Sequence, residues 1–322
     1  MSAAHDPRAW AGAGEAATER AGTVAGRGDA PRNPMIDTHQ HFWRYDSAEY
    51  GWIDDSMAAL QRDFLPPDAL QEMERTGVTR SIAVQARQTL EETRSLLDLS
   101  DRYPFIVGVV GWIDLQAGDV VRQLAEFHDR PALVGIRHIV QTEPDGFLAR
   151  SAVRASIAQL EQTGLVYDIL VYARQLPQAA AFARAFPRQP FVLDHLGKPD
   201  IRSGGFRDWR RHLTALAALP NVACKLSGLV TEADWQAWTP GLLRPYLDAA
   251  LEAFGPSRLM LGSDWPVCTV AASYTAVVGL VLDAIAEYSE AEKREILGGT
   301  AERTYVRLNA QATREMIERK NS

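Results

Sequence analysis

From Met35 onward the chain alternates short apolar runs, rich in β-branched residues, with longer segments that carry apolar residues at helical spacing. The short runs are typical of strands buried on both faces, and the longer segments are typical of amphipathic helices. Several of the longer segments end at a Gly or a Pro, residues that stop helices. The predicted strands are Met35–His41, Arg80–Gln85, Ile106–Trp112, Leu133–His138, Val166–Leu170, Phe191–His195, Val222–Ser227 and Leu259–Asp264. The predicted helices are Pro67–Thr76, Glu91–Tyr103, Asp119–Asp129, Ser151–Thr163, Leu176–Phe186, Phe206–Leu219, Leu242–Phe254 and Ala271–Glu287.

This regular alternation of strands and helices predicts an α/β protein of the (β/α)8 TIM barrel type. A doubly wound open sheet is the alternative. The first predicted strand is not followed by the Gly-x-Gly-x-x-Gly of a dinucleotide-binding sheet, which argues against that alternative. We therefore predict one barrel domain over residues 35–309.

The two ends of the chain differ from this pattern. Residues 1–34 are rich in Ala, Gly and Arg, and they show neither an apolar periodic face nor the apolar core of a signal peptide. We expect them to form a disordered tail, or to precede the true start of the protein at Met35. Residues 310–322 are a charged segment that we expect to form a C-terminal tail.

The composition is that of an ordinary globular protein, with 46% hydrophobic and 23% charged residues among 322. The net charge of −7 argues against a nucleic-acid partner and against an anionic membrane surface, because both favour basic proteins. No apolar run is long enough to suggest a membrane span. Two cysteines, Cys224 and Cys268, exclude a disulfide scaffold and favour a reducing compartment, so we expect a cytoplasmic protein. The sequence leaves homo-oligomerisation open.

Titratable residues gather at the carboxyl ends of the predicted strands, which is where TIM barrels carry their active sites. Random placement would scatter these residues over the barrel. The other histidines, His5, His128 and His212, fall in the tail or on helical surfaces, where we expect solvated side chains. The residues at the strand ends are His39, His41, Arg137, His138, Asp194, His195, Lys225 and Asp264.

The first predicted strand ends in His39-Gln40-His41. Because side chains alternate along a strand, both imidazoles face the same side, about 6–7 Å apart. Neutral imidazole is a common ligand of divalent metals, so one small group or ion can contact both side chains. Alone, the pattern also fits two histidines that are satisfied by neighbours in a half-buried strand.

Three features together resemble the amidohydrolase superfamily: a His-x-His ending strand one, a histidine ending strand six and Gly-Ser-Asp-Trp-Pro ending strand eight. The segments Met35–Trp43, Leu193–Pro199, Lys225–Leu229 and Gly262–Val267 further resemble its amidohydrolase-2 branch, which contains sugar lactonases and pyrone dicarboxylate hydrolases. The likeness covers nearly all of the chain after residue 34. The combined motifs are specific for the branch, and much less specific for a substrate.

The resemblance implies that His39, His41, His195 and Asp264 line the reaction centre. Asp264 would be the general base that takes a proton from the attacking water and passes it to the leaving alkoxide. The same four residues could hold one divalent metal such as zinc, since three protein ligands and a water form a catalytic zinc arrangement.

The sequence departs from two-metal members of the superfamily. Those members need a bridging lysine or glutamate near strand four and a histidine that ends strand five. Here strand four ends Arg137-His138 and strand five reads Val166–Leu170, which argues against a binuclear site.

A reaction without a metal is the alternative, because some lactonases of this branch work without one. His39, His41, Arg137, His195 or Lys225 would then stabilise the developing negative charge as preorganised donors. The sequence leaves both alternatives open, and Arg137 joins the predicted catalytic residues in either case.

We predict hydrolysis of a small lactone, first a sugar lactone such as L-fuconolactone, to its hydroxy acid by water activated at Asp264. The segment 43–64 is too long for an ordinary connector, and its aromatic residues are suited to stacking on a sugar ring. The predicted substrate-binding residues are Trp43, Gln85, Trp112, His138, Lys225 and Trp265.

Other functions stay open at this point. A hydrolase of dicarboxylate lactones from aromatic degradation would need two anion clamps, for which Arg87, Arg137, Lys198 and Lys225 are candidates. A decarboxylase of the same branch and a non-catalytic barrel that senses a sugar acid are the remaining alternatives.

Overall fold

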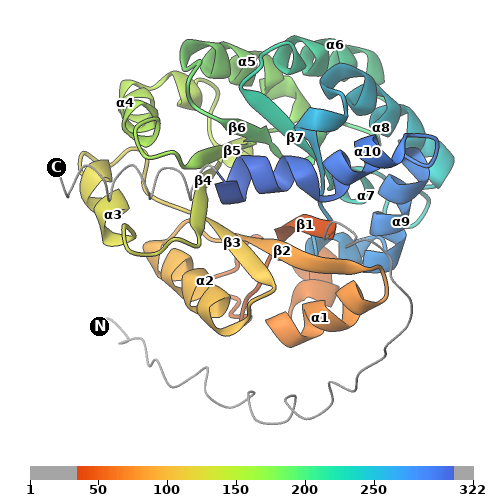
Figure 1. Cartoon of the computed structure of the whole chain (residues 1–322), viewed down its shortest axis with the longest axis horizontal. Coiled ribbons are helices and arrows are strands. Elements are labelled where there is room, and N and C mark those ends of the chain that lie inside the picture. Colours follow the sequence, from red (N-terminus) through yellow and green to blue (C-terminus); the bar gives the residue numbers. More distant parts are fainter. Residues whose placement is uncertain (1–34, 308–322) are drawn as a thin grey trace. The chain divides into compact units, whose positions relative to one another are not determined.

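The structure is a computed structural model that describes residues 35–307. Eight parallel strands follow one another in chain order around a barrel, and helices lie between them (Figure 1). The TIM-barrel prediction is therefore confirmed, whereas the predicted tails at residues 1–34 and 310–322 lie outside the described residues. The strands are β1 (Met35–Gln40), β2 (Val78–Val84), β3 (Ile106–Gly111), β4 (Leu133–Ile139), β5 (Val166–Leu170), β6 (Phe191–Leu193), β7 (Val222–Leu226) and β8 (Leu259–Leu261).

The helices follow the predicted pattern with shifted ends. Their boundaries depend on local caps: α9 begins after Ser273, whose hydroxyl accepts from the Ala276 N–H at 3.2 Å, and not at Ala271 as predicted. None of the helices within residues 35–307 is both long and apolar enough to cross a membrane. The helices are α1 (Pro66–Glu74), α2 (Leu90–Arg102), α3 (Val120–Glu126), α4 (Ser151–Leu160), α5 (Leu176–Ala185), α6 (Phe206–Ala217), α7 (Leu229–Glu232), α8 (Pro240–Phe254), α9 (Tyr274–Ala284) and α10 (Glu290–Arg294).

The barrel closes where β8 meets β1. The Thr38 hydroxyl donates to the Leu261 carbonyl at 2.7 Å. Beyond the end of β8, the Asp264 N–H donates to the His39 carbonyl at 3.0 Å, and the His41 N–H donates to the Trp265 carbonyl at 2.7 Å. The closing bonds thus involve the same residues that carry the predicted chemistry.

A layer of apolar, mostly branched side chains fills the barrel below this edge, as is usual for the fold. Ala301 and Tyr305, which follow α10, pack into the same layer and plug the other end. The sequence pattern predicted no element in this last segment. The strand residues in the layer are Ile36, Ile82, Val84, Val110, Val134, Val166, Val192, Ala223 and Met260.

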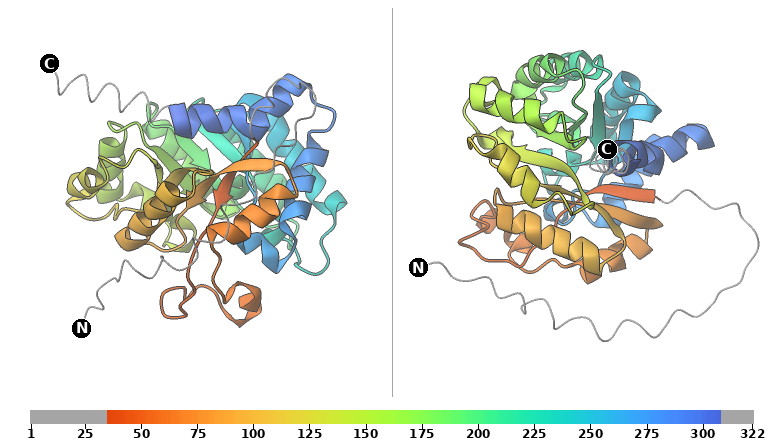
Figure 2. Two further views of the ribbon diagram at one scale, coloured as in Figure 1. Left: turned by 60° about the horizontal axis from the view of Figure 1, so that its bottom comes forward. Right: turned by 60° about the vertical axis from the view of Figure 1, so that its left-hand side comes forward.

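The long β1–α1 connection, residues 43–64, projects from one end of the barrel (left view of Figure 2). Its ends are tied together, because Trp43 and Phe64 exchange two backbone hydrogen bonds of 2.9 Å. Phe64 also packs edge-on against Trp265, with 5.4 Å between ring centres. The connection is therefore anchored beside the carboxyl ends of β1 and β8.

Glu92, in the first turn of α2, is a buried carboxylate that holds the β2–α2 turn. It accepts from the backbone N–H groups of Ala86 at 3.0 Å and Arg87 at 2.5 Å. Burial outweighs these bonds and raises the pKa of Glu92 from 4.5 to about 7. The ionised form is thus disfavoured in the folded state near neutral pH.

This shift predicts a pH-dependent stability. A raised carboxyl pKa stabilises the fold fully below pH 4.5, and this contribution is lost as the pH rises to about 7. The loss is on the order of 3 kcal/mol. We expect Glu92→Gln to weaken the pH dependence of the free energy of unfolding between pH 5 and about 7. Denaturant titrations at several pH values measure this dependence. Glu91→Gln, on the exposed face of α2, is the control and should keep the wild-type slope, and an unchanged slope in Glu92→Gln would contradict the assignment.

Candidate active site

The two histidines of β1 reach the barrel interior through a local irregularity of the strand. Ile36 belongs to the apolar layer, so strict alternation would place His39 on the opposite face. The pairing of β1 with β2 shifts register between Asp37 and Gln40, as in a β-bulge. The extra residue turns His39 inward, and His41 then faces the same side. Alternation from His39 to His41 gives both histidines one shared face, as predicted, and the register shift in β1 turns that face inward.

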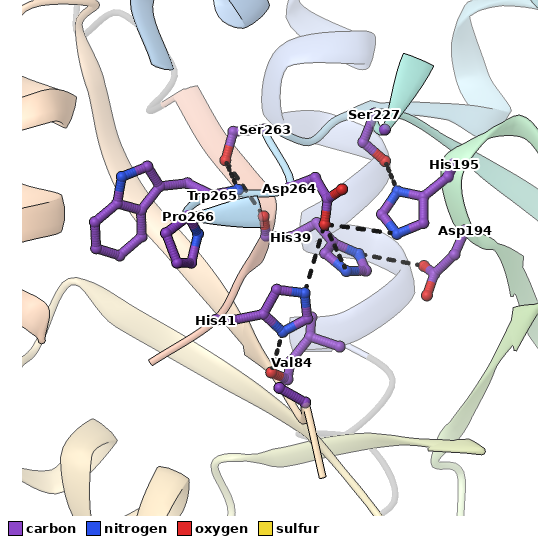
Figure 3. Close-up of polar contacts among 12 residues, drawn as sticks. His39, His41, Val84, Asp194, His195, Ser227, Ser263, Asp264, Trp265 and Pro266 are labelled. Carbon is purple, nitrogen blue, oxygen red and sulfur yellow. Dashed lines mark hydrogen bonds and ion pairs between the residues drawn. The ribbon is translucent and has the colours of Figure 1, made fainter. Parts of the chain in front are cut away.

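Three imidazoles surround one oxygen of Asp264 (Figure 3). The Oδ1 atom of Asp264 lies 3.8 Å from His39 Nε2, 3.5 Å from His41 Nε2 and 3.7 Å from His195 Nε2. His39 lies in β1 and His41 directly follows it, whereas His195 lies in the turn after β6 and Asp264 in the turn after β8. The structure thus brings together the four residues that were predicted to line the reaction centre.

The second nitrogen of each imidazole has its own partner. His41 Nδ1 donates to the Val84 carbonyl at 2.7 Å. His195 Nδ1 lies 2.9 Å from the Ser227 hydroxyl, and His39 Nδ1 lies 3.4 Å from Asp194 Oδ1. Because these contacts fix the rings, each Nε2 atom is held toward Asp264.

Backbone geometry fixes the carboxylate in the same way. Asp264 adopts a left-handed backbone conformation, with φ of 62°, and so does His195, with φ of 52°. Such conformations cost energy for residues other than Gly and cluster at functional sites. Below them, Asp37 Oδ1 accepts from the N–H groups of both His39, at 3.1 Å, and Ser263, at 2.8 Å. One buried carboxylate therefore positions the two segments that carry His39 and Asp264.

Electrostatics favour neutral imidazoles for His39 and His195 and an ionised carboxylate for Asp264 at neutral pH. Burial lowers the pKa of His39 well below its usual value and lowers that of His195 to about 4. Burial alone would raise the pKa of Asp264, but His195, His41 and His39 lower it below its ordinary range. The neutral imidazoles of His39 and His195 can each offer a nitrogen lone pair to a cation.

This donor set suits a metal ion. Ligand atoms of His39, His195 and Asp264 lie within 4.8 Å of one another, and all three side chains are buried. The N···O separations of 3.5 to 3.8 Å are too long for good hydrogen bonds. They are close to the distance of about 3.3 Å between neighbouring ligands on a tetrahedral zinc ion. A cation among these atoms would also balance the negative charge of the buried Asp264 carboxylate.

A network of buried charges supports His39 from below. Arg137 Nη1 lies 3.1 Å from His39 Nε2 and donates to Asp194 Oδ2 at 3.0 Å. Lys225 Nζ lies 3.0 Å from Asp194 Oδ1, 2.5 Å from Asp168 Oδ2 and 3.2 Å from His39 Nδ1. Although burial opposes it, the charges of Lys225 and Arg137 and the contact with His39 hold the pKa of Asp194 well below its usual range. Arg137, one of the predicted catalytic residues, thus lies beside the histidine cluster, and its catalytic role stays a prediction.

The predicted substrate-binding residues fall into three places. Gln85 and Lys225 are fully buried beside the histidines, and the Gln85 amide donates to the Arg137 carbonyl at 3.1 Å. Trp43 and Trp265 pack with the long connection, and the Trp43 indole N–H donates to the Arg62 carbonyl at 2.9 Å.

Trp112 and His138 form a separate cluster. The Trp112 indole N–H donates to His138 Nδ1 at 3.2 Å, and His138 Nε2 lies 2.9 Å from Glu143 Oε1. The His138 ring also stacks on Phe147, with ring centres 4.5 Å apart. The structure does not bring this pair into the histidine cluster, and its contact with a substrate stays a prediction.

Several residues of the site had no predicted catalytic or binding role, although Asp194 was among the titratable residues at the strand ends. Asp37 and Asp194 stand next to predicted residues in Asp-Thr-His-Gln-His and Leu-Asp-His, so their spacing from the histidines was a usable signal. Asp168 is a carboxylate inside an otherwise apolar strand, which is also a signal. Tyr305, whose hydroxyl donates to Asp168 at 2.8 Å, gives no such sign in the sequence.

Comparison with known proteins places the chain among relatives of this architecture. L-fucono-1,5-lactonase from Burkholderia multivorans (strain ATCC 17616 / 249) is 46% identical over 283 residues, which cover 84% of this chain and 95% of the relative. L-fucono-1,5-lactonase from Burkholderia ambifaria is 42% identical over 242 residues, covering 74% of this chain and 82% of the relative. A crystal structure of an amidohydrolase from Burkholderia multivorans with bound zinc is 45% identical, has a TM-score of 0.82, and covers 84% of this chain and 99% of that chain.

The amidohydrolase family model matches residues 36–307, which include every strand of the barrel and all four residues around the Asp264 oxygen. The chain belongs to the amidohydrolase family.

Proposed function

We propose that the protein hydrolyses a neutral sugar lactone, of the L-fucono-1,5-lactone type, to its hydroxy acid. The observation that carries this proposal is the convergence of three imidazoles on one carboxylate oxygen at the carboxyl edge of the barrel. The two lactonases at 46% and 42% identity support the choice of substrate class. The sequence-based prediction of a sugar lactonase agrees with these relatives.

In this reaction Asp264 takes a proton from a water molecule whose oxygen attacks the lactone carbonyl carbon. Collapse of the tetrahedral adduct breaks the bond between that carbon and the ring oxygen. Asp264 returns the proton to the departing ring oxygen, which becomes the hydroxyl of the open-chain acid. Arg137, beside His39, adds positive charge near the developing oxyanion.

We further propose that His39, His41, His195 and Asp264 hold one zinc ion. The relative crystallised with zinc and the closeness of the ligand atoms of His39, His195 and Asp264 support this assignment. When bound, zinc would supply Lewis acidity to the lactone carbonyl. The purified protein should then contain about one zinc ion per chain, as measured by elemental mass spectrometry. His195→Ala should lower this zinc content.

A dicarboxylate substrate is less well supported, because the cations that it would need already have partners. Arg137 pairs with Asp194, and Lys225 pairs with Asp168 and Asp194. The other two candidates are paired as well, Lys198 with Glu232 and Arg87 with Glu49. Structures of 2-pyrone-4,6-dicarboxylic acid hydrolases, at 17% and 21% identity, share the fold alone.

The buried thiols of Cys224 and Cys268 are unpaired, so we place the reaction in a reducing compartment, the cytoplasm. The partner that the proposal requires is the small lactone itself.

A hydrolysis screen with a pH indicator tests the proposal on neutral aldonolactones and on pyrone dicarboxylate. We expect kcat/KM to be at least about 10²-fold higher for the neutral sugar lactones. Because His195 loses its lone pair on protonation, activity should fall as the pH drops through about 4. Preference for the dicarboxylate, or no hydrolysis of any lactone, would overturn the proposal. Repeating the screen after chelation tells whether the bound metal is required for turnover.

A further inference from the structure

An ion pair lies at the meeting point of the turns that follow β5, β6 and β7. Lys198 Nζ lies 2.9 Å from Glu232 Oε1, and it also lies 5.7 Å from the centre of the Tyr172 ring. The side chains of Lys198 and Glu232 are only 15% and 16% exposed, so the pair is neither sealed inside the protein nor open on the surface. The Tyr172 residue is 36% exposed, which leaves part of its surface free.

This pair is tied to the reaction centre by the backbone. The Lys198 N–H donates to the His195 carbonyl at 2.8 Å, and the backbone of Lys198 is left-handed, with φ of 47°. On the other side, Gly228 lies so close to His195 that an added Cβ would stand 2.6 Å from the ring. The helix α7 begins at the next residue and carries Glu232 at its end. Both partners of the ion pair are therefore held in register with His195.

Electrostatics agree with this placement. Burial favours the neutral amine, but the carboxylates of Glu232 and Asp264 raise the pKa of Lys198 above its usual value. Lys198 therefore stays charged, and it lies within electrostatic reach of the proposed general base.

The chemistry of the pair selects for one kind of ligand. An ammonium next to a carboxylate offers both donors and acceptors with no net charge, which suits neighbouring hydroxyl groups. A substrate carboxylate at this place would meet the negative charge of Glu232. The Tyr172 ring adds a flat apolar surface of the kind that packs against the C–H face of a sugar ring.

We propose that Lys198 and Glu232, beside Tyr172, form the subsite that binds the hydroxyl groups of the lactone ring and selects polyhydroxylated over unsubstituted lactones. This inference rests on the proposed lactonase function and names the residues that give it its substrate class. Lys198 and Glu232 act here as specificity-determining residues, and the chemistry stays with Asp264 and the histidines.

The test compares a sugar 1,5-lactone with δ-valerolactone, which has the same ring without hydroxyl groups. The measured quantity is the ratio of kcat/KM for the sugar lactone to kcat/KM for δ-valerolactone. We expect Lys198→Met and Glu232→Gln each to lower this ratio by about 10- to 100-fold, chiefly through a higher KM for the sugar lactone. The matched controls are Arg210→Met and Glu252→Gln, which break an exposed ion pair of 2.7 Å on the outer helices and should leave the ratio unchanged.

A ratio that does not change in Lys198→Met and Glu232→Gln would overturn the subsite, even if both rates fell together. Hydrolysis of δ-valerolactone but not of sugar lactones by the wild type would also overturn the subsite, while leaving lactone hydrolysis intact. If the wild type hydrolyses neither lactone, the proposed function fails first. In that case, calorimetric binding of the matching sugar acid to the wild type and to Glu232→Gln tests the subsite without turnover, and equal affinities would overturn it.

Discussion

Asp264→Asn should lower kcat for lactone hydrolysis by about 10³-fold or more, because the amide cannot accept the proton of the attacking water. The substitution leaves the local backbone intact, since Asn tolerates the left-handed conformation that Asp264 adopts, with φ of 62°. Steady-state kinetics on the best sugar lactone measure the loss. Zinc content is a second readout, because an amide oxygen is a weaker zinc ligand than a carboxylate.

The control for this variant is Asp208→Asn, on the outer face of α6, where the side chain is 67% exposed. Its kcat should equal that of the wild type. A rate for Asp264→Asn within tenfold of the wild type would remove Asp264 from the role of general base. Reduced zinc content with a nearly normal rate would show instead that the carboxylate serves the metal alone.

The sequence alone could predict the barrel and the grouping of most residues of the candidate site, because both depend on periodic and local signals. Strands buried on both faces appear as continuous apolar runs, and their carboxyl ends are marked by residues such as His39, His195 and Asp264. Parallel strands bring those ends to one edge, so residues far apart in sequence meet without further assumptions. Alternation along β7 was equally predictable. The Lys225 side chain points into the barrel, and the neighbouring Cys224 side chain packs outward.

What the sequence could not predict depends on contacts between distant segments. The register shift in β1 is set by its pairing with β2, and nothing in Asp37–Gln40 marks an extra residue. Tyr305 enters the barrel from a segment after the last strand, and helical periodicity does not reveal which end of a barrel such a segment plugs. The roles of Trp43 and His138 also depend on partners, Arg62 and Glu143, that are visible only in three dimensions.

Lys225→Met should lower the free energy of unfolding by about 3–5 kcal/mol, because it leaves two buried carboxylates without their shared cation. Lys225 is fully buried, and its Nζ lies 2.5 Å from Asp168 and 3.0 Å from Asp194. Burial already raises the pKa of Asp168 in the presence of the lysine. Without the lysine, only protonation can remove the buried charge of Asp168 and Asp194. The loss of stability should therefore be larger at pH 8 than at pH 5. Denaturant titrations at both pH values measure the change.

The double variant Lys225→Met/Asp168→Asn separates unpaired charge from lost packing. Because it removes one of the two stranded carboxylates, it should recover part of the lost stability and weaken the pH dependence. It also gives a measurable protein if the single variant does not fold. Lys293→Met, which breaks an ion pair with Glu290 within α10, is the surface control. It should lower the free energy of unfolding by less than about 1 kcal/mol. If Lys225→Met cost no more than this control at either pH, the buried network would not be what holds His39 in place, and its position would have to come from the β1 backbone alone.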